Sequence, residues 1–203
     1  MSGMNLTELG RQMYERAGLR PDDPPCEGIT RVAAELLQDG DFLFVSDRAP
    51  IEATIGRYGG RTRIVVARMS PRRRNFAIAR MLARIELEQL RAWSERSERL
   101  LGGFLVAPEP SVCAVVREFG IDLEVIASTF VVTETCAALR VVEVGAADGI
   151  VVTPERVYRP GRLMSWACDE QARAIARARR PRSVRRVPIL DEPDRVALYR
   201  HAG

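Results

Sequence analysis

The chain has 203 residues with 31 basic and 27 acidic side chains and a formal net charge of +4, and every basic residue is an arginine. Because lysine is absent, Schiff-base chemistry, a Walker-type phosphate loop and a kinase-type catalytic lysine are excluded. The only histidine is His201, so a zinc site with two or three histidines from one chain is excluded as well. The hydrophobic content of 46% is that of a soluble globular chain, of one domain or of one domain with a small appendage.

Several sequence features bear on the cellular compartment. The longest apolar stretches fall far short of the roughly 18 residues that would suggest a membrane span, so no membrane association is expected. The first residues have neither the basic start nor the apolar stretch of a signal peptide. The four cysteines form no C-x-x-C pair and are typical of reduced thiols. We therefore expect a cytoplasmic protein.

The first half of the chain predicts helices and then a small sheet. The spacing of apolar residues predicts two helices and three short strands, at 6–17, 27–38, 42–46, 51–58 and 61–69. Between the last two strands, Gly59-Gly60 indicates a hairpin. Ser70-Pro71 is typical of a helix start, and a long helix is predicted from about 72 to 94.

The second half predicts short helices followed by a part of different character. The helices are predicted at 100–106, 111–118, 122–130 and 133–142. After them the pattern predicts two strands, one helix and a terminal hairpin, at 150–153, 156–159, 163–180, 187–190 and 195–200.

The most informative stretch is RRRNFAIARMLARIEL, residues 72–87. By itself it predicts an amphipathic helix, with Arg80 and Arg84 one turn apart beside an apolar side. It also resembles the core helix of the ImmA/IrrE-type zinc peptidases, in which an arginine-led R-F-T-L-A-H-E-L-G-H segment follows a three-stranded antiparallel sheet and carries the H-E-x-x-H motif.

The resemblance extends beyond one helix. Leu105-Val106-Ala107-Pro108 matches the L-L-M-P that ends the family's next helix, and 119–134 is similar to its G-L-D-L-E tail. The match in order and spacing runs from Thr7 to about Val142. It implies an α+β fold: a small antiparallel three-stranded sheet packed on the long helix, a helical middle, and a C-terminal α/β appendage. The corresponding domains are 1–145, the ImmA/IrrE-like domain, and 146–203, the appendage.

The same resemblance implies that the zinc site is lost. In the family, two histidines hold zinc, a glutamate between them polarises the metal-bound water, and an acidic side chain from the following helix is the third ligand. Here Arg80, Met81 and Arg84 occupy the first three positions, and the third-ligand position falls on Ser97. A guanidinium is always protonated and cannot ligate zinc. We therefore expect no catalytic residue, no bound metal and no cofactor.

Two arginines that point into a former metal pocket need counter-charges. The candidates for these ion pairs are Glu88, at i+4 from Arg84, and Glu95 or Glu98 from the next helix. The alternative is that both arginines are solvated on an exposed helix face.

A basic run near the C-terminus is the strongest electrostatic feature of the sequence. It contains no acidic residue, and its members are Arg173, Arg177, Arg179, Arg180, Arg182, Arg185 and Arg186. Such a run can bind a phosphate backbone. The alternative is a solvated helix end that interacts favourably with its own dipole.

The favoured function is that of a catalytically inactive pseudo-metallopeptidase, a regulatory or scaffolding protein that binds a protein partner. Members of the family act on helix-turn-helix repressors in mobile elements and DNA-damage responses, so the resemblance implies a repressor as the partner. The second hypothesis is a nucleic-acid-associated protein that uses the basic run. An active metallopeptidase with atypical ligands is the least favoured.

Overall fold

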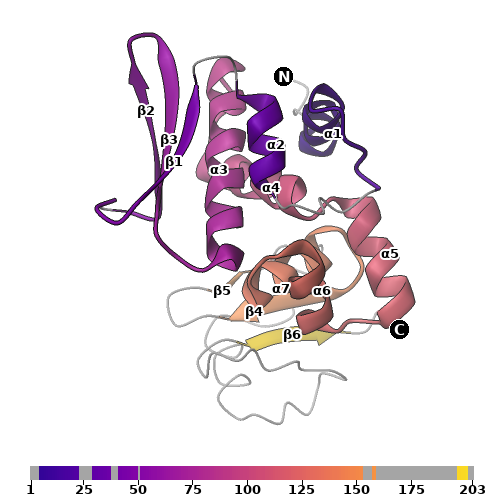
Figure 1. Ribbon diagram of the computed structural model, residues 1–203. Helices are drawn as coiled ribbons and strands as arrows, with labels where there is room; N and C mark the ends of the chain where they lie inside the picture. Colours follow the sequence, from indigo (N-terminus) through magenta and orange to yellow (C-terminus); the bar gives the residue numbers. More distant parts are fainter. Residues whose placement is uncertain are drawn as a thin grey trace. The chain divides into compact units, whose positions relative to one another are not determined.

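The computed structural model describes residues 5–22, 29–37, 41–49, 51–152, 157–158 and 196–200. Its helices are α1 (Leu6–Arg16), α2 (Ile29–Leu36), α3 (Pro71–Gln89), α4 (Glu95–Val106), α5 (Glu109–Phe119), α6 (Leu123–Phe130) and α7 (Glu134–Glu143). Its strands are β1 (Phe42–Ser46), β2 (Ala53–Tyr58), β3 (Arg61–Ala67), β4 (Asp148–Val152), β5 (Val157–Tyr158) and β6 (Val196–Arg200) (Figure 1). The predicted α+β class is confirmed.

The chain divides into two compact units. One comprises Met1–Ser111 and Ser128–Val132, and the other comprises Val112–Ala127 and Thr133–Gly203. The predicted domain boundary between 145 and 146 stays a prediction.

The first unit contains a three-stranded sheet in the order β1-β3-β2. β2 and β3 form the predicted hairpin, with Gly59 and Gly60 at the positive φ angles, 58° and 80°, that this tight turn requires. The sheet is mixed, whereas an antiparallel sheet was expected, because β1 pairs in parallel with β3. Since β1 lies beside β3 and not beside β2, the reversal of direction at each of the two turns makes β1 and β3 run the same way.

β3 is the central strand of the sheet, and among the described side chains of the three strands only residues of β3 are fully buried. Ile64 and Val66 are fully buried on the face that packs against α3, and Ile55 of β2 pairs with Ile64 in the antiparallel register. Figure 1 shows α3 lying along this face of the sheet.

α3 ends before the residue that the sequence suggested. Its last helical residue is Gln89, with Leu90 as the C-cap and Arg91 at a φ of 53°. α4 then begins at Glu95, where Ser94 and Ser97 form a reciprocal capping box. The early end of α3 allows α4 to fold back and pack along it.

α1 and α4 form much of the remaining core of this unit. Tyr14 is fully buried, and its hydroxyl donates a hydrogen bond of 2.7 Å to the Leu105 carbonyl in the last turn of α4. Its ring meets Phe104 edge to face, with centroids 5.9 Å apart. These contacts fix α4, which carries part of the candidate site.

The second unit contains α7 and a sheet in the order β5-β4-β6, in which β4 is antiparallel to both neighbours. Within α7, Arg140 and Glu143 form a buried ion pair of 2.9 Å. The helix predicted at 163–180 and the strand predicted at 187–190 lie outside the described residues.

Across the described ranges, no single helix is both long and apolar enough to cross a membrane, and two bent pairs of neighbouring helices pass that test only when the two helices of a pair are taken together.

Candidate functional site

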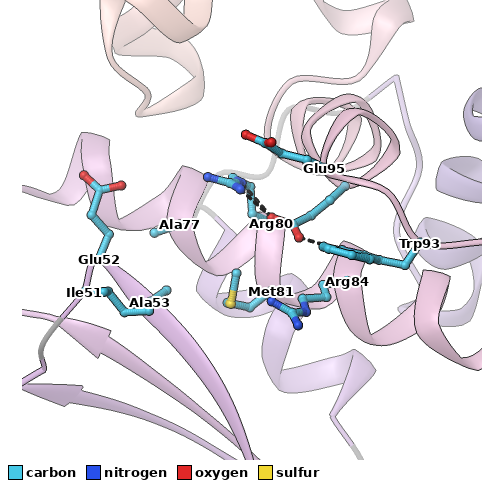
Figure 2. A pocket seen from close by; sticks show the side chains of 10 residues that line it. Ile51, Glu52, Ala53, Ala77, Arg80, Met81, Arg84, Trp93 and Glu95 are labelled. Carbon is cyan, nitrogen blue, oxygen red and sulfur yellow. Dashed lines mark hydrogen bonds and ion pairs between the residues drawn. The ribbon is translucent and has the colours of Figure 1, made fainter. Parts of the chain in front are cut away.

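A hollow of about 450 Å³ opens in the first unit beside the start of β2, between it and the helices α3 and α4. Residues at positions 77, 80, 81 and 84 share one side of α3 and form one wall, as expected for helical spacing. Figure 2 shows the lining side chains, which are Ile51, Glu52, Ala53, Ala77, Arg80, Met81, Arg84, Trp93, Glu95 and Glu98.

The most buried polar group in this wall is the Glu98 carboxylate, whose side chain is only 3% exposed. Arg80 donates from Nε to Glu98 Oε1 at 2.8 Å, and its Nη2 lies 2.6 Å from the same oxygen. The indole N–H of Trp93 donates to Glu98 Oε2 at 2.8 Å (Figure 2). Both carboxylate oxygens therefore have donors, and the position of Glu98 in the first turn of α4 favours its negative charge further.

A close approach of the two helices makes this ion pair possible. A Cβ atom on Gly102 of α4 would lie 3.1 Å from the backbone nitrogen of Arg80 and 3.2 Å from its Cα. Glycine at this position therefore lets α4 pack directly on the α3 backbone at Arg80. Glu98 lies one turn earlier on α4 and so comes within reach of the Arg80 guanidinium.

Arg84 has a different set of partners. Its Nε lies 2.7 Å from Glu88 Oε1, one turn further along α3. Its guanidinium carbon also lies 5.0 Å from the centre of the Trp93 ring, which is within the range of a cation–π contact. Trp93 therefore contacts Arg84 through its ring and Glu98 through its N–H.

The structure brings together most of the residues predicted at the former metal positions and as their ion-pair partners. Arg80 pairs with Glu98, and Arg84 pairs with Glu88. Met81 and Glu95 line the hollow together with Arg80, Arg84 and Glu98, whereas Glu88 lies outside its lining. Ser97 differs from the expectation, because its hydroxyl binds the Ser94 backbone at the start of α4 and does not line the hollow. Glu98, one residue later, is the side chain that enters it.

Two parts of the site were missed in the sequence. Trp93 was not predicted as a site residue, although it precedes Glu98 by only five residues. The opposite rim, Ile51 to Ala53, comprises the two residues before β2 and its first residue, and it carries no sequence signal for a site. The arginines of the basic run, Arg173 to Arg186, lie outside the described residues.

Within the described ranges, no group of three His, Cys, Asp or Glu side chains is arranged to hold a metal ion. Searches with family models and among curated proteins find no match to this sequence.

A solved structure of a transcriptional regulator from Mycobacterium tuberculosis has a similar fold, with a TM-score of 0.64 and 16% sequence identity. The match covers 90% of this chain and 64% of the regulator, so this chain spans just under two thirds of that protein. At this level of identity the similarity shows a shared fold alone.

Proposed function

We propose that the chain is a catalytically inactive pseudo-metallopeptidase of the ImmA/IrrE type, which binds a protein partner in the hollow and acts as a regulatory or scaffolding protein. The observation that carries this proposal is the Arg80–Glu98 ion pair in the wall of the hollow. By the resemblance, Arg80 stands where the family has its first zinc ligand. A guanidinium, which stays protonated, takes the place of the metal as the counter-charge of the acidic side chain from the next helix.

The residues at the motif positions support binding more than hydrolysis. Met81, in the position of the catalytic glutamate, has no group that could act as a base. Glu98 is engaged through both oxygens by Arg80 and Trp93. The carboxylate is therefore used to hold α4 against α3.

The rim of the hollow suits a polypeptide. Ile51 and Trp93 are exposed apolar side chains beside the charged wall. β2 is an edge strand among the described strands of its sheet, so an extended segment of a partner can add to it through backbone hydrogen bonds. Side chains of that partner segment would then reach the hollow.

The regulatory part of the proposal rests on two similarities. The Mycobacterium tuberculosis protein of similar fold is a transcriptional regulator. The ImmA/IrrE resemblance suggests a helix-turn-helix repressor as the partner, bound without being cut.

Site-specific photocrosslinking in the native host tests this proposal. A photoreactive amino acid in place of Ile51, in the lining of the hollow, is expected to form an adduct with one protein partner. The same substitution at Leu90, which is exposed but outside the lining, is the matched control and is expected to form none. Adducts of equal yield at both positions would contradict binding in the hollow.

The partner identified in this way allows the second half of the proposal to be tested. The purified chain is expected to bind that partner, to lose the binding in the Ile51→Arg variant, and to leave the partner intact when zinc is added. Cleavage of the partner by the purified chain would show that it is an active peptidase.

A further inference from the structure

The face of the β1-β3-β2 sheet that lies away from α3 carries exposed aromatic side chains. In the registers of the sheet, Phe44, Val65 and Thr54 share this outer face, and Tyr58 shares it with Arg61 and Arg63. Tyr58 is 79% exposed and Phe44 is 48% exposed, which is unusual for large rings. Figure 1 shows α3 on the inner face and no described helix or strand on the outer one.

The two rings and an arginine lie on a diagonal across this face. Tyr58 lies at the Arg61 end of β2, Arg63 lies two residues further along the central strand, and Phe44 lies beside Val65 on β1. The Arg63 guanidinium carbon is 5.8 Å from the centre of the Tyr58 ring. From the strand spacing and the rise per residue, the rings are about 10 Å apart across the sheet and about 13 Å apart along it. Each ring can therefore stack on its own planar group, but the two rings are too far apart to contact the same group.

Among the residues of the three strands, the charge on this face has one sign. The three strands contain no acidic residue. Among the acids at the strand ends, Asp47 pairs with Arg68, and Glu52 pairs with Arg73. Asp41 accepts a hydrogen bond from the backbone of Thr62. Arg61 is exposed at the hairpin end of the outer face, and its positive charge has no acidic neighbour on the strands.

The space between these side chains is open. Gly56 lies on the outer face opposite Arg63 and two residues before Tyr58. A Cβ atom built on Gly56 would meet nothing within 4 Å. The ring of Tyr58 thus stands beside a strip of bare backbone, and a planar group can approach it.

We propose that this outer sheet face binds a single-stranded nucleic acid, with bases stacked on Tyr58 and Phe44 and phosphates contacted by Arg61 and Arg63. Single-stranded nucleic acids are bound through the combination seen here, namely aromatic side chains for the bases and positive side chains for the backbone. The bases of a duplex are already stacked on each other and cannot occupy the rings. The same face of a second copy would offer these arginines no acidic side chain from its three strands. None of these four residues lines the hollow.

Fluorescence anisotropy with a labelled oligothymidylate and an oligouridylate of equal length tests the proposal in the full-length protein. Tyr58→Ala is expected to weaken binding about 5- to 150-fold, the loss typical of one stacked base, whereas Tyr58→Phe keeps the ring and stays close to wild type. Arg61→Ala is expected to lower the slope of log affinity against log salt by about 0.7, as for one phosphate contact on a single strand.

Arg57 is the matched control for Arg61. It lies in the same hairpin and is exposed, but its register partner Thr62 places it on the inner face. Arg57→Ala is therefore expected to change the salt slope less than Arg61→Ala. A self-complementary duplex is expected to bind more weakly than either single strand. The ratio of the affinities for the oligothymidylate and the oligouridylate shows whether the face prefers DNA or RNA.

The proposal would be overturned by the absence of binding to both single strands, by equal affinity of Tyr58→Ala and wild type, or by equal salt slopes for the two arginine variants. Tighter binding of the duplex would exclude stacking. Protein association that depends on Tyr58 without nucleic acid would instead identify the face as a contact between copies.

Because Tyr58 and Arg61 are exposed, both variants are expected to keep the wild-type midpoint of urea unfolding.

Discussion

The Arg80–Glu98 pair combines two environments within one interaction. Glu98 is almost fully buried, whereas about a third of the Arg80 side chain, 34%, is exposed in the hollow. A buried carboxylate without a partner has a high free energy, so Glu98 depends on Arg80 and Trp93. The arginine depends less on the glutamate, because water can solvate its exposed part. The two partners should therefore respond unequally to substitution.

This asymmetry leads to a prediction on stability. Arg80→Met should lower the free energy of unfolding by about 1 to 3 kcal/mol, less than for a fully buried pair, because Glu98 keeps its charge and loses its main donor. The double variant Arg80→Met, Glu98→Leu should regain most of this loss, since no buried charge remains. Urea unfolding of the four proteins of the cycle measures the coupling. Strictly additive losses would show that the pair contributes no specific interaction.

At the scale of single residues, the sequence predicts the Arg84–Glu88 pair well, because both members lie on one helix at a fixed spacing. It could not select Glu98 over Ser97 or Glu95. That choice depends on the loop between α3 and α4, whose length follows from the end of α3 at Gln89. No glycine or proline marks that end, and the left-handed residue there is Arg91.

At the scale of elements, the contact between α1 and α4 is unusually close. A Cβ atom on Gly10 would lie 2.4 Å from Cδ1 of Phe104, and the Phe104 ring is buried. Glycine lowers the stability of a helix interior relative to alanine by about 1 kcal/mol. The packing of Phe104 against α1 therefore explains why a poor helix former occupies this position.

A glycine-to-alanine substitution tests this packing. Gly10→Ala is expected to destabilise the protein by about 1 to 3 kcal/mol through overpacking, although alanine favours the helix. In a Phe104→Leu background, which has a smaller side chain, the same substitution should cost less or become stabilising. Thermal and urea unfolding of the four variants measure this change. An increase in stability for Gly10→Ala alone would rule out the close contact.

The order of strands was harder to predict than the strands themselves. In the first unit, each run of β-type residues gave a strand close to its expected position, and Gly59-Gly60 identified the β2–β3 hairpin. The position of β1 beside β3 depends on which strand has a neighbour along both of its edges. Ile64 and Val66 of β3 are fully buried on the face towards α3, and this burial fits the central place of β3 in the sheet. A pattern read along one strand does not contain this information.

At the scale of the molecule, the chain leaves the first unit after Ser111 and returns to it for only five residues, Ser128–Val132. Within the first unit, Asn75 of α3 donates a hydrogen bond of 3.1 Å to the Val131 carbonyl. Val131 has a φ of 51°, a left-handed conformation that is unfavourable for a β-branched residue. The returning segment therefore depends on contacts such as this one to hold its conformation.

Loss of the Asn75 amide should release this segment selectively. In the full-length protein, Asn75→Leu is expected to cost about 1 to 3 kcal/mol, because it leaves a part-buried carbonyl without its donor. Amide hydrogen exchange should become faster in peptides that cover Ser128–Val132 and change little in α7. Gln12→Leu is the control, since it removes an amide from an exposed position on α1 and should leave exchange in this segment unchanged. Equal acceleration in α7 would mean that Asn75 supports the whole molecule and not the returning segment alone.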